Sequence, residues 1–177
     1  MPHDRQRTAT VRSYWNTRIH DLEMTTQPVG SPKFFEELDE YRFDKLAYLP
    51  QVIDFNGYRG KRLVEVGCGV GTDLVRFARG GARVIGVDLS ETAVGLAKAN
   101  LAAGGQAGTM VVADGGDLPL PASSVDVFYA HGVLQYAVVH DLNIGRSVDE
   151  TLRVLQGLQT GGLCSADWKP GQENLKV

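Results

Sequence analysis

The chain has 177 residues and a formal net charge of −3, with basic and acidic side chains mixed along it. This length suits one domain with a sizeable core, and the lack of a dense Lys/Arg tract argues against nucleic acid or an anionic membrane as a partner. No apolar run is long enough to cross a bilayer, and Cys68 and Cys164 form neither a disulfide framework nor a metal-ligand spacing. We expect a cytoplasmic protein without a metal site.

The first 60 residues are expected to form a helical extension. After a frayed start, Thr10 would cap a short helix that ends near residue 19. Ser31 followed by proline is typical of a helix start, and Pro50 is expected to stop this second helix after Leu49. Its apolar side chains fall near one face, so we expect it to pack on the main domain.

From residue 62 onward, apolar strands alternate with helices. Strands are predicted at 62–66, 83–87, 109–113 and 125–130, helices at 72–79 and from Ser90 to 103, and a loop crossing under the sheet at 117–121. A further helix over about 147–155 and a last possible strand at 163–168 would follow. This alternation predicts an α/β fold with right-handed crossovers and a mostly parallel sheet.

Three glycines at alternate positions follow the first predicted strand, in the order Glu65-x-Gly67-x-Gly69-x-Gly71. Glycine permits a tight turn and close approach of a ligand, and the next helix presents free N–H groups there. The combination indicates a cradle for a nucleotide-type cofactor. The dinucleotide fingerprint requires glycine or alanine at a third position that Thr72 occupies here.

This pattern resembles motif I of the S-adenosylmethionine-dependent methyltransferases with a Rossmann-like fold, and the resemblance extends over about Lys61 to Leu155. It implies a class I, type 11/25-like methyltransferase domain. The fold would be three-layered, with a doubly wound, mostly parallel sheet, helices on both faces and the N-terminal helical extension. The implied cofactor is S-adenosylmethionine. The acidic surface, which has no charge pattern, favours a small-molecule methyl acceptor over nucleic acid.

Two acids at strand ends complete the cofactor prediction. Asp88 ends the second strand, where its two oxygens could accept hydrogen bonds from both ribose hydroxyls; the alternative is that it only begins the turn before Ser90. Asp114 ends the third strand, where the resemblance implies that it faces the adenine amino group, with the backbone N–H of Gly115 near the ring. The alternative for Asp114 is an Asx turn.

The resemblance also implies that Glu65 and Gly67 receive the methionyl tail of the cofactor, whose ammonium group suits a carboxylate. His131 falls where the family's residue abuts that tail, and it is also a candidate proton acceptor. The full cofactor-binding prediction comprises Glu65, Gly67, Cys68, Gly69, Gly71, Asp88, Leu89, Asp114, Gly115 and His131. The catalytic candidates are His131, Tyr136 and His140, and Cys68 is interpreted as a small filler rather than a nucleophile.

Aromatic and basic side chains of the extension give further hypotheses. Tyr14 and Trp15 could close as a lid over a sulfonium, since aromatic faces attract cations, or they could simply pack. Arg42 and Lys45 could reach the cofactor carboxylate or lie on a solvated helix face.

The C-terminal part departs from the family pattern. Arg153-Val154-Leu155 lacks the expected K-P-G-G continuation, and the run 163–168 is polar for a buried strand. Either three residues are inserted or the sequence after Leu155 is not ancestral. We expect the domain at 61–177 to lack its last strands, which would leave a sheet edge open to another chain. The alternatives to an active methyltransferase are a truncated, inactive cofactor-binding fragment and an NAD-dependent oxidoreductase.

Overall fold

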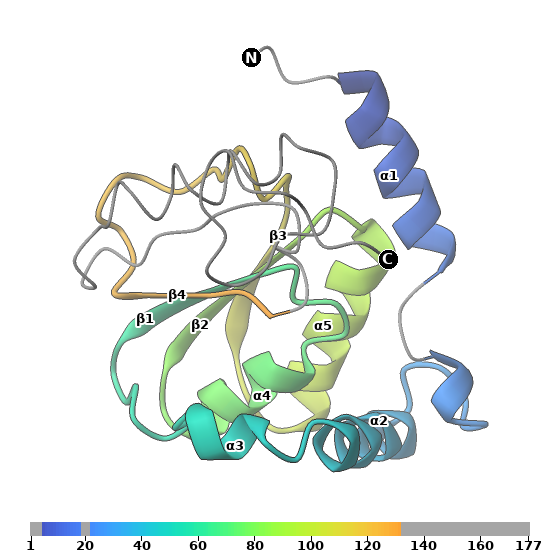
Figure 1. Ribbon diagram of the computed structural model, residues 1–177, viewed down its shortest axis with the longest axis vertical. Helices are drawn as coiled ribbons and strands as arrows, with labels where there is room; N and C mark the ends of the chain where they lie inside the picture. Colours follow the sequence, from blue (N-terminus) through green and yellow to red (C-terminus); the bar gives the residue numbers. More distant parts are fainter. Residues whose placement is uncertain (1–4, 19–21, 132–177) are drawn as a thin grey trace, which may run out of the picture. The chain divides into compact units, whose positions relative to one another are not determined.

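A computed structural model describes residues 5–18 and 22–131 (Figure 1). The chain divides into two compact units, residues 1–131 and 132–177, and all the elements below belong to the first. The helix expected at 147–155, the strand expected at 163–168 and the candidates Tyr136 and His140 lie outside the described residues.

Four parallel strands form one sheet in the order β3-β2-β1-β4. They are β1 (Arg62–Val66), β2 (Arg83–Asp88), β3 (Gly108–Val112) and β4 (Val127–Tyr129), close to the predicted ranges. The chain adds strands on one side of β1 and then returns to its other side for β4. Ligands of open α/β sheets bind at such a reversal, outside the carboxyl ends of the strands.

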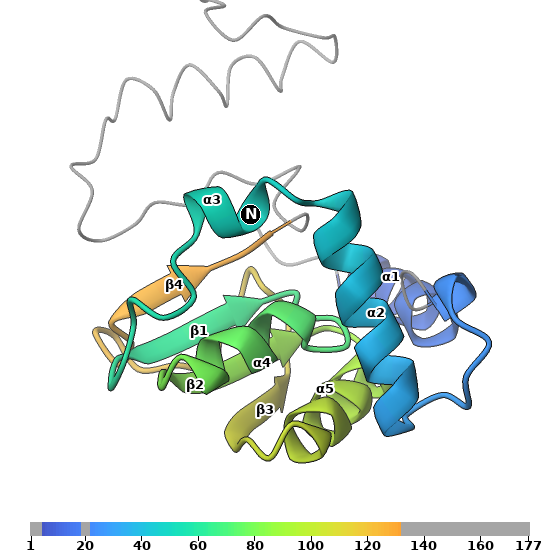
Figure 2. The ribbon, with the colours of Figure 1, turned by 90° about the horizontal axis from the view of Figure 1, so that it is seen from below.

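Two amphipathic helices cover one face of this sheet. Figure 2 shows α4 (Thr72–Arg79) and α5 (Glu91–Ala103) along that face, as two successive right-handed crossovers require. The core between them and the strands contains Leu63, Leu74, Val75, Phe77, Val84 and Leu101. Leu118 and Leu120 pack against the valines of the other face, which confirms the loop expected to cross under the sheet.

The first helix begins earlier than predicted. Helix α1 spans Arg5–Thr17, whereas the sequence predicted a cap at Thr10 and an end near residue 19. The residues before Thr10 include two arginines, a glutamine and an alanine, all good helix formers, so nothing in them stops the helix from starting sooner. A single 3₁₀ turn, η1 (Leu22–Met24), follows.

The second helix starts as predicted but ends sooner. Helix α2 (Pro32–Lys45) is capped by Ser31, whose hydroxyl accepts the N–H of Phe34 at 3.2 Å. The predicted end at Leu49 is wrong, because Leu49 begins a separate short helix, α3 (Leu49–Val52). Pro50 lies in the first turn of α3, where a missing N–H costs nothing, so it helps to start a helix instead of ending one.

The extension packs on the main domain as expected. Phe34, Phe35 and Leu38 of α2 are buried, and Val70 and Leu96 pack against them. Within residues 5–18 and 22–131, none of the helices has the length and apolar character needed to cross a membrane.

Candidate functional site

The glycine loop between β1 and α4 has the left-handed backbone that its sequence predicts. Gly67, Gly69 and Gly71 have φ angles of +70°, +53° and +75°. A Cβ on Gly71 would lie 3.0 Å from the Cβ of Ala97, so the loop fits tightly against α5. A Cβ on Gly69 would meet nothing within 4 Å. The loop therefore presents open backbone on the side away from α5.

The N–H groups of this loop are already in use. Gly67 and Cys68 both donate to the carbonyl of Val87, at 2.7 and 3.1 Å. Gly71 donates to the carbonyl of Cys68 at 2.8 Å, and Gly69 donates to a side chain described next. The internal hydrogen bonds fix the loop's shape and leave these four amides without a free proton for a phosphate.

Asp88, at the end of β2, joins the loop to α5. Its Oδ2 accepts the N–H of Gly69 at 2.9 Å, and its Oδ1 accepts the N–H of Ser90 at 2.9 Å. Ser90 caps α5 as predicted, since its hydroxyl accepts the N–H of Ala93 at 3.1 Å. Asp88 thus begins the turn before Ser90, as one interpretation of the sequence expected. The predicted contact with a ribose is compatible with this role, because each carboxylate oxygen has a second lone pair for a ligand hydroxyl.

Asp114 follows β3 and forms the Asx turn that the sequence allowed. Its Oδ1 accepts the N–H of Gly116 at 2.9 Å, while its Oδ2 accepts the hydroxyl of Thr8 at 3.2 Å. A Cβ on Gly115 would lie 2.9 Å from Val66, so this turn passes close to the end of β1. The glycine loop, Asp88 and Asp114 therefore follow three adjacent parallel strands at one edge of the sheet.

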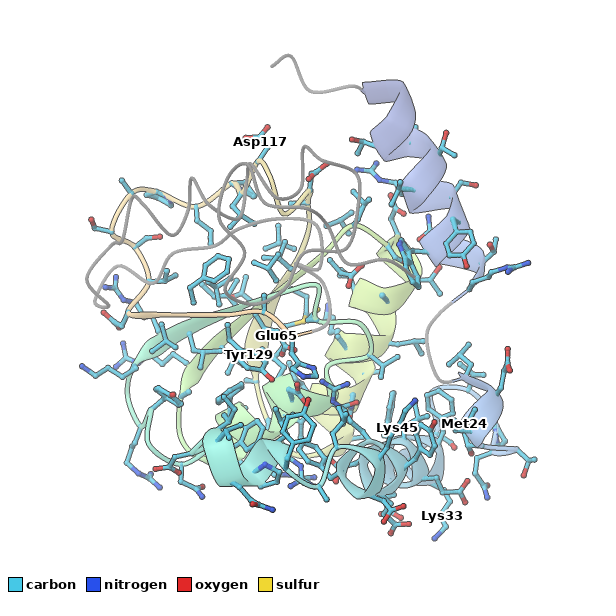
Figure 3. All side chains as sticks on the ribbon, in the orientation of Figure 1. Met24, Lys33, Lys45, Glu65, Asp117 and Tyr129 are labelled. Atoms are coloured by element: carbon cyan, nitrogen blue, oxygen red, sulfur yellow. The ribbon has the colours of Figure 1, made fainter. Side chains whose placement is uncertain are left out.

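Glu65 is a buried carboxyl on the helix-covered face of the sheet. It is 4% exposed, and its partner across the strands is Tyr129 of β4 (Figure 3). Among the described residues, no group hydrogen-bonds to its Oε2. Burial raises the pKa of Glu65 well above its usual value, and the negative charge of nearby Asp73 adds to this effect.

A bidentate ion pair lies beside Glu65. Asp73, in the first turn of α4, is 1% exposed and accepts Nε and Nη2 of Arg42 at 2.6 Å each. The hydroxyl of Tyr129 donates to the same carboxylate at 2.8 Å. Burial lowers the pKa of Arg42, but its hydrogen bonds and its charge interaction with Asp73 outweigh this and raise it overall. The pKa of Tyr129 is raised by burial and by Asp73.

This ion pair corrects the interpretation of Arg42 as part of a solvated helix face. The sequence analysis also missed Asp73 and Tyr129, although an acid directly after the glycine loop was a usable signal. Lys45 contacts Tyr41 of its own helix, with Nζ 3.0 Å from the phenol oxygen.

His131 lies between Arg42 and Tyr48. Its Nδ1 is 3.1 Å from Nη2 of Arg42, and its Nε2 is 3.3 Å from the hydroxyl of Tyr48. Because guanidinium can only donate, Nδ1 must accept, and a neutral ring then carries its proton on Nε2 and donates it to Tyr48. This arrangement suits a positioning residue better than a proton acceptor.

Helix α1 forms hydrogen bonds with the segments that directly follow β2 and β3. The hydroxyl of Ser90 donates to the side-chain carbonyl of Asn16 at 2.7 Å, and the Asn16 amide donates to Glu91 at 2.6 Å. Together with the hydrogen bond from Thr8 to Asp114, these contacts hold α1 beside the carboxyl ends of β2 and β3, where Asp88 and Asp114 lie. Tyr14 and Trp15, in edge-to-face contact, are 49% and 40% exposed.

Cys68 lies within the glycine loop, whereas a separate surface hollow lies away from the predicted site residues. Burial raises the pKa of the Cys68 thiol, which keeps it in the poorly nucleophilic protonated form. Residues 5–18 and 22–131 contain no cluster of metal-ligating side chains. A surface hollow of about 610 Å³ is lined by residues 50–56 with Arg76 and Arg79, and it includes no predicted site residue.

An open parallel sheet with a glycine loop and acids at adjacent strand ends defines an α/β protein of the nucleotide-cofactor-binding class. The family model described as a methyltransferase domain matches residues 64–164, so the chain belongs to this methyltransferase domain family.

Solved structures agree with this assignment. The magnesium protoporphyrin IX methyltransferase of Synechocystis PCC 6803 with bound SAM is 25% identical, with a TM-score of 0.50 over 72% of this chain and 62% of that one. The same enzyme with bound SAH gives a TM-score of 0.50 over 72% of this chain and 59% of that one. A phosphoethanolamine N-methyltransferase of Haemonchus contortus, 19% identical with a TM-score of 0.52 over 75% of this chain and 26% of that one, shares the fold.

Short matches to curated proteins point elsewhere. A protein of Clostridium pasteurianum, named as a peroxiredoxin in the rubredoxin operon, is 66% identical over 44 residues, which are 25% of each chain. The peroxiredoxin YkuU of Bacillus subtilis is 73% identical over 44 residues, 25% of this chain and 24% of its own. The chain thus spans about a quarter of the length of these relatives, which does not show membership of their family.

Proposed function

We propose that this chain binds S-adenosylmethionine and transfers the methyl group to a small-molecule acceptor. Membership of the methyltransferase domain family supports the reaction class, and the likeness to a SAM-bound methyltransferase supports the cofactor. The observation that carries the proposal is the open backbone at Gly69, which Asp88 of the neighbouring strand holds and which follows the strand that contains the buried Glu65.

Each predicted residue has a chemical role in this proposal. Asp88 accepts the ribose hydroxyls with its remaining lone pairs, and half-buried Leu89 packs beside the adenosine. Asp114 accepts from the adenine amino group, with the N–H of Gly115 near the ring. Glu65 is the counter-charge for the ammonium group of the methionyl tail, since its Oε2 has no hydrogen-bond partner among the described residues.

S-adenosylmethionine supplies, when bound, an electrophilic methyl group on a positively charged sulfur. The residues of this chain align an attacking atom with it and exclude water. His131 positions the hydroxyl of Tyr48 through the contact at 3.3 Å. Tyr136 and His140 remain candidates for accepting a proton from an acceptor that must lose one.

Helix α1 acts as a lid over the adenosine side. Its support is the pair of contacts from Thr8 to Asp114 and from Asn16 to Ser90. Deleting residues 1–30 is expected to weaken cofactor affinity without unfolding the sheet. An unchanged affinity would remove the lid from the proposal.

An NAD-dependent oxidoreductase is a poorer fit to the site. A pyrophosphate would need N–H groups of the glycine loop, but those of Gly67, Cys68, Gly69 and Gly71 already donate internally. It would also approach the buried carboxyls of Glu65 and Asp73. Excess NAD should therefore fail to displace a bound S-adenosyl compound.

Isothermal titration of the folded chain with S-adenosylmethionine and S-adenosylhomocysteine tests the proposal. Binding of both is expected, and no heat above background from folded protein would overturn it. Binding without turnover on a broad panel of small acceptors would favour the alternative of a cofactor-binding protein that performs no transfer. Cytoplasmic location and the lack of a nucleic-acid partner stay predictions from composition.

A further inference from the structure

The charges around Glu65 do not balance. Three carboxyls, those of Glu65, Asp73 and Asp88, come from β1, α4 and β2, and the negative charges of Asp73 and Asp88 both raise the pKa of Glu65. The guanidinium of Arg42, from α2, is the one cation among the described groups that lowers the pKa of Glu65. Tyr129 of β4 and Cys68 of the loop also face this carboxyl and stay neutral, since burial raises the pKa of both.

The guanidinium of Arg42 donates hydrogen bonds to Asp73 rather than to Glu65. Both oxygens of Asp73 accept from the guanidinium at 2.6 Å, and Tyr129 adds a third hydrogen bond at 2.8 Å. Glu65 has no such partner at its Oε2, although it is 4% exposed. An ionised carboxylate buried without a hydrogen-bonded counter-charge is costly, and a carboxyl in that position takes up a proton instead.

We propose that Glu65 carries a proton in the free protein and gives it up when the ammonium group of the S-adenosyl ligand arrives, so that ligand binding releases a proton. The inference rests on the proposed function. The O–H bond of the carboxyl breaks, the proton passes to solvent, and the carboxylate left behind pairs with the ammonium. No oxidant or further reactant is needed. Glu65 is neutral in the free chain, and in the bound chain its negative charge is paired with the ammonium group.

The experiment is calorimetric titration of the intact chain with S-adenosylhomocysteine in buffers of different ionisation enthalpy, between about pH 5.5 and 7.5. The dependence of the heat on the buffer gives the number of protons released. We expect up to about one proton per ligand, with affinity rising up to about tenfold per pH unit wherever Glu65 is protonated in the free protein. Methylthioadenosine, which keeps the adenosine but lacks the ammonium, should bind without this release.

Two variants make the test specific to one side chain. Glu65→Gln should bind S-adenosylhomocysteine more weakly and lose the proton release, whereas Glu36→Gln, an exposed residue of α2, should keep it. If Glu65→Gln does not fold, the comparison of the two ligands on the unaltered chain still decides. Equal proton counts for both ligands would overturn the inference while leaving the proposed function intact. Failure of both ligands to bind would overturn the proposed function itself.

Discussion

The backbone N–H of Gly69 donates to Oδ2 of Asp88 at 2.9 Å, so that the loop after β1 is tied to the end of β2. The same carboxylate holds the first turn of α5 through the N–H of Ser90. One side chain therefore sets the position of two segments that any ligand at this edge would contact. Asp88 therefore has a structural role that is independent of the ligand-binding role proposed for it.

Asp88→Asn tests this relationship. An amide can present one oxygen, so its NH₂ group would face one of the two N–H donors, and we expect a loss of about 1–3 kcal/mol in the free energy of unfolding. S-adenosylhomocysteine affinity should fall as well. Urea unfolding and calorimetry measure the two effects. Asp117→Asn, at an exposed position (Figure 3), should change neither, and equal behaviour of the two variants would contradict the role of Asp88.

Gly71→Ala tests the fit of the loop against α5. The new Cβ would lie 3.0 Å from the Cβ and 3.2 Å from the Cα of Ala97, and φ at this position is +75°. We expect a loss of about 1–3 kcal/mol in the free energy of unfolding. The matched control is Gly95→Ala at an exposed position of α5, where nothing lies within 4 Å of the new Cβ. That change should stabilise the chain by about 0.4–1 kcal/mol.

The order of elements was predictable because local signals agree along this part of the chain. Glycines after residues 79 and 103 end α4 and α5, and Ser31 and Ser90 cap their helices, so each boundary has its own chemical cause. Pro50 was misread because a proline that ends one helix and a proline that begins the next look alike in sequence. Whether a helix continues through residues 46–48 depends on tertiary packing.

The strand-end residues of the site could be predicted, whereas its side-chain network could not. The alternation of strands and helices places Glu65, Asp88 and Asp114 at one edge of the sheet without further information. The contact between Arg42 and Asp73 depends on how α2 docks on α4, which no sequence periodicity specifies. Asn16 likewise reaches Ser90 only through the docking of α1.

Arg42→Ala tests the buried ion pair. Removing the guanidinium leaves Asp73, which is 1% exposed, with the hydroxyl of Tyr129 as its remaining side-chain donor among the described residues, so we expect a loss of about 3–5 kcal/mol in the free energy of unfolding. Urea unfolding measures it. Lys33→Ala removes a cation of the same helix from a pair in which both side chains are 65% exposed, and its effect should stay below about 1 kcal/mol. Similar losses in both variants would show that Arg42 contributes no more than a surface charge.

The tautomer of His131 follows from the same contacts. With Arg42 donating to Nδ1, the neutral ring should carry its proton on Nε2, and nitrogen-15 NMR distinguishes the two tautomers directly. Tyr48→Phe should leave this tautomer unchanged, because the guanidinium alone excludes a proton on Nδ1. A ring protonated on Nδ1 in the unaltered chain would contradict the arrangement.

Glu65→Gln tests the buried carboxyl in the absence of any ligand. Burial raises the pKa of Glu65 in the folded chain above its value of 4.5 in the unfolded chain, so the folded state binds the proton more tightly. The stability from this group is therefore fully present below about pH 4.5 and is lost as the pH rises through the folded pKa, at no more than about 1.4 kcal/mol per pH unit. Urea unfolding between about pH 5 and 8 should show the unaltered chain losing stability relative to Glu65→Gln as the pH rises. Glu36→Gln should run parallel to the unaltered chain, and a Glu65→Gln curve that also runs parallel would mean that Glu65 is ionised throughout this range.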